Sequence, residues 1–191
     1  MSLVLPFDGH TPAIDASAWV APNATLIGQV TLAADSSVFY GAVLRADTDS
    51  ISIGAGSNLQ DNVAVHCDYG TPTIVGERVS VGHSAVLHGC TIEDDCLIGM
   101  SATVLNGAVI GAGSLVAAGA VVLEGTIIPP HSLVAGVPAK VRRELTDGEV
   151  AEVTANAAHY MELSRQHAAL RSGVVDSVGS QASTNGSAIP T

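Results

Sequence analysis

The most regular feature of the chain is an aliphatic residue at every sixth position. From Ile92 to Val134 this step of six continues without interruption. Three shorter runs keep the same step over residues 26–44, 53–65 and 75–87. Neither an α-helix, with a period of 3.6, nor a single-faced strand, with a period of 2, produces a step of six. The pattern therefore predicts short strands that alternate with corners, as in parallel β-helices.

Three hexads close one triangular coil, because each hexad supplies one inward aliphatic residue and one turn of the chain. The four runs contain eighteen hexads, which predicts about six stacked coils over residues 20–140, after a lead segment over residues 1–19. The step has three extra residues between 44 and 53, four extra between 65 and 75, and one too few between 87 and 92. We expect loops or bulges there. The predicted fold class is an all-β solenoid of hexapeptide repeats.

A different pattern follows the repeats. Thr146 and Glu149 form a capping box, the signature of a helix N-terminus. Apolar residues then recur at helical spacing, which predicts one α-helix within residues 145–170 that packs on a face of the solenoid. Residues 172–191 are rich in Ser, Gly and Thr, and we expect a disordered tail.

Composition narrows the functional classes. Apolar residues make up 47% of the 191 residues but aromatic residues only 3%, so the core is built from small aliphatic side chains. The net charge of −11 repels nucleic-acid phosphates and anionic lipid headgroups. The length corresponds to a single domain. We therefore expect neither nucleic-acid binding nor membrane docking.

The cysteines and the N-terminus indicate a compartment. Three cysteines are an odd number without a disulfide-framework spacing, and the first ten residues lack the charged start and apolar run of a signal peptide. No run of about 18 apolar residues is present to span a bilayer. The sequence predicts free thiols and a cytoplasmic location.

Three of the seven histidines fall into register with the coils. His66 and His88 are 22 residues apart, of which four belong to the insertion between 65 and 75, so they occupy the same slot in successive coils. Arg45 occupies that slot one coil earlier. By the same counting, Asp61 and His83 form a second column on another face. The remaining histidines have ordinary explanations in the lead segment, a proline-rich corner and the helix: His10, His131, His159 and His167.

One subunit can hardly bring both columns to a single point, but a symmetric ring of subunits can, and a triangular prism favours closure at three. His66 and His88 would then meet His83 of a neighbour, which gives three imidazoles and an open position, the ligand set of a catalytic zinc. The alternative is that these histidines are surface residues placed by chance. Cys67 and Cys90 adjoin the first column, but neighbouring strand positions point to opposite sides, so we expect both thiols to face the core.

Three segments around these positions resemble the γ-class carbonic anhydrase family of left-handed β-helix proteins. They are GAVLRAD at residues 41–47, GSNLQDN at 56–62 and VGHSAVLHGC at 81–90. The resemblance extends from about Ala18 to Leu170. It implies a homotrimer with intersubunit metal sites bound by His66, His83 and His88, and reversible hydration of carbon dioxide to bicarbonate by a metal-bound hydroxide.

The resemblance also implies roles for other residues. Gln60 would orient the metal-bound hydroxide and Asn58 would position substrate. Arg45 and Asp61 would pair across the interface, and Asp47 would help to order the site. Tyr160 matches a helix tyrosine that leans over the metal pocket, although simple helix packing would also explain it. The expected metal is zinc, while three imidazoles also suit iron or cobalt.

Two departures from the family pattern bear on activity. Thr48 stands where the most active members carry a glutamate, and residues 67–73 lack their long acidic loop. Because fast hydration must export a proton, we expect slow turnover or none. Three other functions stay open: a hexapeptide-repeat acyltransferase with one histidine as general base, a metal-stabilised trimeric scaffold, and a thioesterase-like enzyme of the same fold.

Overall fold

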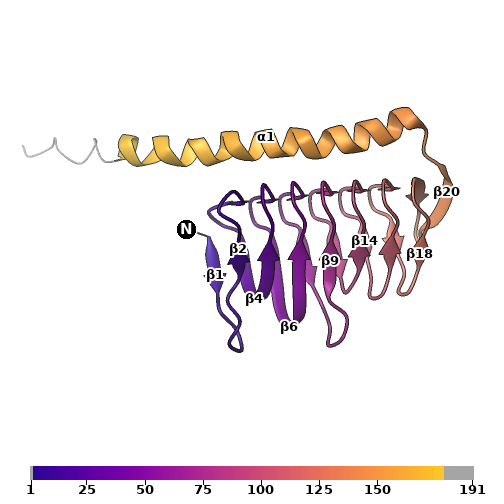
Figure 1. Ribbon diagram of the computed structural model, residues 1–191, viewed down its shortest axis with the longest axis horizontal. Coiled ribbons are helices and arrows are strands. Elements are labelled where there is room, and N and C mark those ends of the chain that lie inside the picture. Colours follow the sequence, from indigo (N-terminus) through magenta and orange to yellow (C-terminus); the bar gives the residue numbers. More distant parts are fainter. Residues whose placement is uncertain (1, 179–191) are drawn as a thin grey trace, which may run out of the picture.

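A computed structural model describes residues 2–178 of the chain, with side chains up to Leu170. The chain forms a left-handed parallel β-solenoid of about seven turns, and one long helix, α1 (Asp147–Val178), runs beside it (Figure 1). The predicted fold class is confirmed. Within the described residues no helix is long and apolar enough to cross a membrane.

The strands stack in parallel along three faces. The first face consists of β1 (Leu3–Leu5), β8 (Ala64–His66), β11 (Val86–His88), β14 (Thr103–Val104), β17 (Val121–Val122) and the first halves of β4 (Thr25–Leu32) and β6 (Val43–Ile53). The second consists of β2 (Ala13–Ile14), the second halves of β4 and β6, β9 (Thr73–Val75), β12 (Thr91–Ile92), β15 (Val109–Ile110) and β18 (Ile127–Ile128). Because β4 and β6 continue around a corner, these two faces form one 12-stranded sheet.

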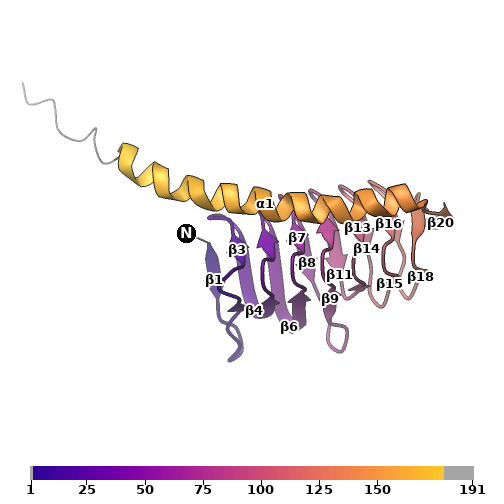
Figure 2. The same ribbon diagram turned by 45° about the horizontal axis from the view of Figure 1, so that its top comes forward.

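The third face is a separate eight-stranded sheet. It consists of β3 (Trp19–Val20), β5 (Ser37–Val38), β7 (Asn58–Leu59), β10 (Ser80–Val81), β13 (Leu97–Ile98), β16 (Leu115–Val116), β19 (Ser132–Ala135) and the antiparallel β20 (Lys140–Glu144). Helix α1 contacts β3, β5, β7 and β10 of this sheet. It runs along the solenoid back towards the N-terminal coils (Figure 2).

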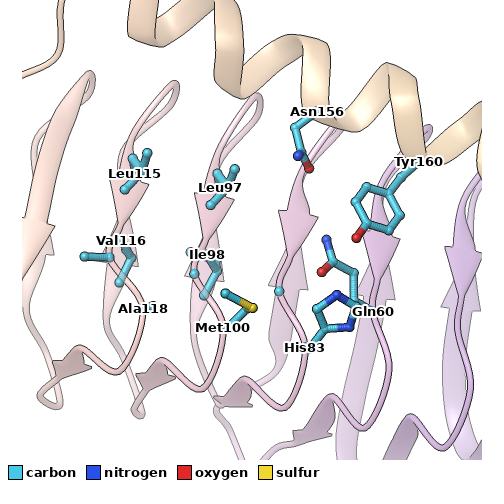
Figure 3. A pocket seen from close by; sticks show the side chains of 13 residues that line it. Gln60, His83, Leu97, Ile98, Met100, Leu115, Val116, Ala118, Asn156 and Tyr160 are labelled. Atoms are coloured by element: carbon cyan, nitrogen blue, oxygen red, sulfur yellow. The ribbon is translucent and has the colours of Figure 1, made fainter.

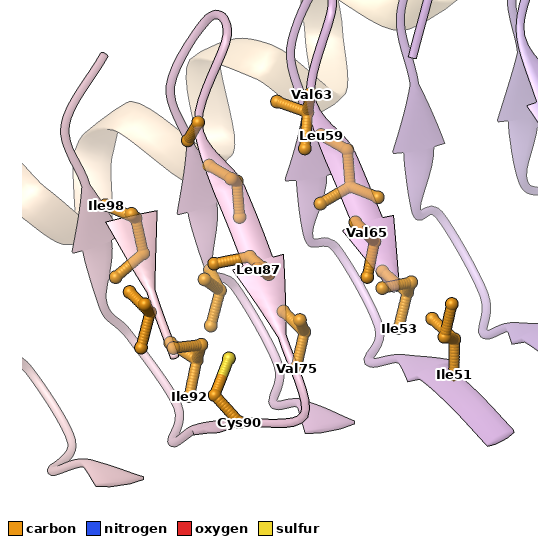
Figure 4. Packing of buried hydrophobic residues seen from close by; sticks show 14 of the residues in the cluster. Ile51, Ile53, Leu59, Val63, Val65, Val75, Leu87, Cys90, Ile92 and Ile98 are labelled. Carbon is orange, nitrogen blue, oxygen red and sulfur yellow. The ribbon is translucent and has the colours of Figure 1, made fainter. Parts of the chain in front are cut away.

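The six-residue repeat supplies the core. Leu44, Val65 and Leu87 are in register on successive coils, and each is at most 2% exposed. Equivalent columns from the other faces meet them inside the prism (Figure 4). Each coil forms backbone hydrogen bonds only with the coils directly before and after it. An inserted or deleted residue in one coil therefore shifts the side chains of that coil out of register with those of the next coil.

The interruptions of the repeat lie where the counting placed them. In β6, Ala46 pairs with Gly28 and Ile51 with Val30, so residues 47–50 form a bulge opposite Gln29. Residues between β8 and β9 form a short loop closed by a bridge between Asp68 and Thr71. Both features lie at the corner that follows the first face, beside His66.

The domain limits differ at both ends. The lead segment, residues 1–19, already contains solenoid strands, because β1 and β2 pair with β4 and β3 pairs with β5. This additional turn carries the step of six back from Leu26 through Val20 to Ile14, positions that the counted runs left out, and it raises the number from six to about seven. The capping box of Thr146 and Glu149 is confirmed, with Thr146 N donating to Glu149 Oε2 at 2.9 Å. The helix ends at Val178 rather than Leu170, since elongation costs little once a helix has started. The rest of the predicted tail, residues 179–191, lies outside the described residues.

Candidate metal centre

His66 and His88 lie side by side at the ends of β8 and β11. The two residues are direct register partners, which confirms that they occupy equivalent slots one coil apart. Nδ1 of His66 and Nε2 of His88 are 2.9 Å apart. Both side chains are partly buried.

The outer nitrogen of each imidazole contacts an acceptor. Nε2 of His66 lies 2.9 Å from Oδ1 of Asp47, and Nδ1 of His88 lies 2.6 Å from Oδ1 of Asn106. The amide of Asn106 is oriented by its Nδ2, which donates to Oδ2 of Asp68 at 2.8 Å. An ionised carboxylate and an amide oxygen only accept hydrogen bonds, so both outer nitrogens carry the protons.

The inner nitrogens of neutral His66 and His88 therefore present lone pairs to each other across 2.9 Å. Two lone pairs at this distance repel unless a proton or a metal ion lies between them. Neutral imidazole nitrogens are ligands for first-row divalent metals, and hydrogen bonds to the other ring nitrogen are the usual means of orienting them. The donor set of this structure thus fits a transition-metal ion.

Asp47 and Arg45 support this arrangement from the bulge in β6. Nη1 of Arg45 donates to Oδ2 of Asp47 at 2.5 Å. Partial burial of Asp47 opposes its ionisation, but the hydrogen bonds from Arg45 and His66 outweigh this and keep the pKa of Asp47 below its ordinary value. Asp47 is therefore an anion at neutral pH that fixes the ring of His66.

His83 lies elsewhere, at the corner that precedes β11. Its Nδ1 lies 2.9 Å from Oδ2 of Asp61, which confirms the second column. The other oxygen of Asp61 accepts from the backbone N–H of Tyr40 at 3.2 Å. His83 thus also has one nitrogen bound to a carboxylate and leaves Nε2 free for a ligand. Within one chain, His83 does not join His66 and His88; among the described residues, the group of three whose potential ligand atoms all lie within 4.8 Å of one another is His66, Asp68 and His88.

His83 lines the end of a cavity of about 360 Å³ beneath α1. Figure 3 shows Asn156 and Tyr160 projecting from α1 towards Gln60 and His83, while aliphatic side chains line the other end. Burial, and secondarily the charge of Asp61, raise the pKa of the Tyr160 hydroxyl, so it stays protonated. The cavity thus has one polar end and a long apolar end.

The predicted residues Gln60 and Asn58 form a buried hydrogen-bonded chain next to this cavity. Nε2 of Gln60 donates to Oδ1 of Asn58 at 3.2 Å, and Nδ2 of Asn58 donates to Ser80 Oγ at 2.9 Å. These bonds leave the carbonyl oxygen of Gln60 as the group that can accept a hydrogen bond from a molecule beside His83. Gln60 is only 6% exposed, so its orientation is fixed by packing.

The thiols beside the histidines are not available as ligands. Cys67 and Cys90 are buried in the core, as predicted. Burial raises the pKa of Cys90 to about 12. Metals bind the thiolate, so this side chain is inert at neutral pH. Thr48 donates its hydroxyl to the carbonyl of Cys67 at 2.5 Å and links the bulge in β6 to the following loop.

Two residues of the centre were missed from sequence. Asn106 is eighteen residues after His88, one uninterrupted coil, so the same counting that paired the histidines could have found it. Gly89 makes room for it: a side chain there would collide with Oδ1 of Asn106. Asp68 lies within the insertion that interrupts the count, and no sequence signal placed it.

Comparisons with known proteins find similarity to hexapeptide-repeat proteins and to proteins named carbonic anhydrase. The family described as "Bacterial transferase hexapeptide (six repeats)" matches residues 89–124. "Gamma carbonic anhydrase 1, mitochondrial" of Arabidopsis thaliana is 46% identical over 88% of this chain, which spans 63% of that relative's length. A Methanocaldococcus jannaschii protein named "Probable carbonic anhydrase" is 57% identical over 76% of this chain and 91% of its own. The crystal structure of a hexapeptide transferase family protein from Anaplasma phagocytophilum superposes with a TM-score of 0.83 at 39% identity, covering 86% of this chain and 97% of that one.

Proposed function

The chain belongs to the γ-class carbonic anhydrase family, and from this premise we propose that it catalyses the reversible hydration of carbon dioxide to bicarbonate. The observation that carries the proposal is the hydrogen bonding of the three histidines. His66, His83 and His88 each have one ring nitrogen held by a carboxylate or amide oxygen; the other nitrogens of His66 and His88 face each other, and that of His83 is free. That is the arrangement required of neutral metal-ligating imidazoles.

We propose that these three imidazoles hold one zinc ion, for which iron or cobalt are chemically acceptable substitutes. The ion would supply Lewis acidity that lowers the pKa of a bound water to about 7. Asp47 and Asn106 hold the rings of His66 and His88, and Asp61 holds that of His83. The carbonyl oxygen of Gln60 would accept a hydrogen bond from the reacting water and so orient the lone pair of that water, while the apolar wall of the cavity would receive carbon dioxide.

The proposed centre requires more than one subunit. His83 precedes β11 and His88 ends it, so the two side chains lie at opposite edges of the first face of one solenoid. We propose a homotrimer in which His83 of one chain reaches His66 and His88 of the next. In that assembly Arg45, which is half exposed, pairs with a neighbour's Asp61 in addition to Asp47 of its own chain.

The test is metal analysis and carbon dioxide hydration measured on the same preparation. We expect about one metal ion per chain and hydration above the buffer rate that a chelator abolishes. Gln60→Ala should keep its metal but lose about 10–100-fold in kcat, the usual effect of removing an outer hydrogen bond at a metal site. Gln166→Ala, on the exposed face of α1, is the control and should match the wild type. Metal-loaded protein that hydrates no faster than buffer would refute the proposal.

One observation favours a second candidate, a thioesterase-like activity at the same centre. The cavity beside His83 continues over Leu97, Met100 and Leu115, an apolar length that carbon dioxide does not need. An acyl chain would fill it, with its carbonyl at the polar end. Hydrolysis of medium-chain acyl thioesters by the metal-loaded protein, in the absence of hydration activity, would select this candidate.

A further inference from the structure

Asp68 places a carboxylate beside the two paired histidines of its own chain. It lies in the short loop between β8 and β9, which is closed by the backbone bridge to Thr71. The carboxylate of Asp49 fixes the same loop by accepting from the N–H of Gly70 at 2.9 Å. The loop therefore has a defined shape, and a carboxylate oxygen of Asp68 is within 4.8 Å of the ligand nitrogens of both His66 and His88.

We propose that His66, Asp68 and His88 form a complete three-ligand metal site within a single chain, which binds a divalent ion before subunits assemble. This inference rests on the proposed function, because it concerns the same metal centre. Two neutral imidazoles and one carboxylate with open positions are the donor set of non-haem iron(II) sites. Relative to three imidazoles, the carboxylate adds a negative charge and an oxygen donor, so this site favours harder ions such as Fe²⁺.

The contacts of Asp68 allow it to serve as an exchangeable ligand. One oxygen accepts from Nδ2 of Asn106 at 2.8 Å, and among the described residues the other carboxylate oxygen has no hydrogen-bond donor. The side chain is exposed, so it can move without disrupting the core. Asn106 also holds His88, and so the same amide orients a histidine ligand and retains the carboxylate when that carboxylate leaves the metal.

Assembly then exchanges ligands. In the isolated chain Asp68 completes the site; in the trimer the neighbour's His83 takes that position and Asp68 stays on Asn106. The single-chain site captures the ion, and the intersubunit site retains it in the form that activates water. The inference predicts that loss of His83 weakens metal binding without abolishing it, provided that Asp68 is present.

Cobalt binding to five proteins tests this: the wild type, His83→Asn, Asp68→Asn, the double variant, and Asp8→Asn. Asn at position 83 retains an amide donor for Asp61 but no imidazole, and His83→Ala repeats the measurement without the amide. Asp8→Asn is the matched control, because it also removes one exposed carboxylate from a loop. Asp8 lies near Asp49 and Tyr69, at the same corner of the prism as the loop that carries Asp68. Metal-free protein is titrated with Co²⁺ by visible absorption, with bound cobalt and molecular mass determined on the same samples.

We expect one cobalt per chain in the wild type, in Asp68→Asn and in Asp8→Asn. His83→Asn and His83→Ala should still bind one cobalt per chain, with shifted absorption bands, and adding Asp68→Asn should weaken binding at least about tenfold further. If His83→Asn and His83→Ala fold but bind no cobalt, or if the double variant binds as tightly as His83→Asn, the single-chain site is refuted while the three-histidine centre stands. If the wild type itself binds no cobalt and hydrates no carbon dioxide, the proposed function fails as well.

Discussion

At the scale of single residues, the chemistry of the centre depends on which nitrogen of each histidine carries the proton. A free imidazole interconverts between two tautomers, and only one of them presents a lone pair to a given metal position. Asp47, Asn106 and Asp61 each bind the nitrogen that must not ligate. Removal of such a partner leaves the ligand in place but allows the wrong tautomer and a rotated ring.

Asn106→Ala should therefore lower metal affinity by about 10–100-fold without unfolding the protein. The physical reason is the lost acceptor for Nδ1 of His88. Competition with a chelator of known affinity measures the change. Asn23→Ala is the control, since Asn23 also accepts from a neighbouring coil, through the N–H of Gly41, but lies away from the histidines. Equal affinities of the two variants would contradict the assigned role.

At the scale of elements, the start of α1 is fixed by a small ionic cluster. Nη1 and Nη2 of Arg143 in β20 donate to the carboxylate of Glu149, each at 2.7 Å, and Glu149 also accepts from Thr146. The hydrogen bonds from Arg143, followed by those from Thr146, lower the pKa of Glu149 from 4.5 to about 2. This cluster joins β20 to the first turn of α1, the helix that carries Asn156 and Tyr160 over the cavity.

Because the pKa of Glu149 is lowered, the free energy of unfolding should decrease as the pH falls. A carboxyl group whose folded pKa is depressed stabilises the folded state above its unfolded pKa, and the stabilisation is lost as the pH falls through the folded value. We expect Glu149→Gln to be less stable than the wild type at pH 6, and the difference to disappear between about pH 4.5 and pH 2. Urea unfolding followed by circular dichroism at several pH values measures it. Glu152→Gln, in the same exposed helix turn, is the control and should show a much smaller effect.

At the scale of the whole molecule, the corners of the prism decide what the solenoid can do. Arg45 and the paired histidines follow one edge of the first face, and Asp61 with His83 follow the opposite edge. A heterologous contact between unlike edges generates a ring. The ring would enclose a metal centre at each contact, which ties the proposed activity to assembly.

The assembly makes a quantitative prediction for the protein in solution. Light scattering should give a mass of about three times 19.2 kDa for the wild type. Arg45→Ala should shift the equilibrium towards smaller species, because it leaves the carboxylates of Asp47 and of a neighbour's Asp61 without their cation. Arg165→Ala removes an exposed arginine that pairs with Asp35 on the helix side and should stay fully assembled. A monomeric wild type with metal bound would contradict the intersubunit centre.

The sequence alone determined the features that follow from the six-residue repeat. A coil of eighteen residues converts separation along the chain into neighbourhood in space, so counting was enough to pair His66 with His88 and Asp61 with His83. The inward aliphatic residues and the buried thiols follow from the same period. Even Asn106, which was overlooked, lies at a separation that the count contains.

Only the tertiary structure decided the parts that the period does not control. Leu3–Leu5 forms a strand because the edge of β4 offers it backbone partners, although the step of six does not extend back beyond Ile14. Asp68 reaches the histidines because the ends of an inserted loop are held by neighbouring coils, and the carboxylate of Asp47 meets both Arg45 and His66 because β6 bulges there. In each case the position depends on contacts between segments whose spacing no repeat fixes, and such contacts exist only once the coils are stacked.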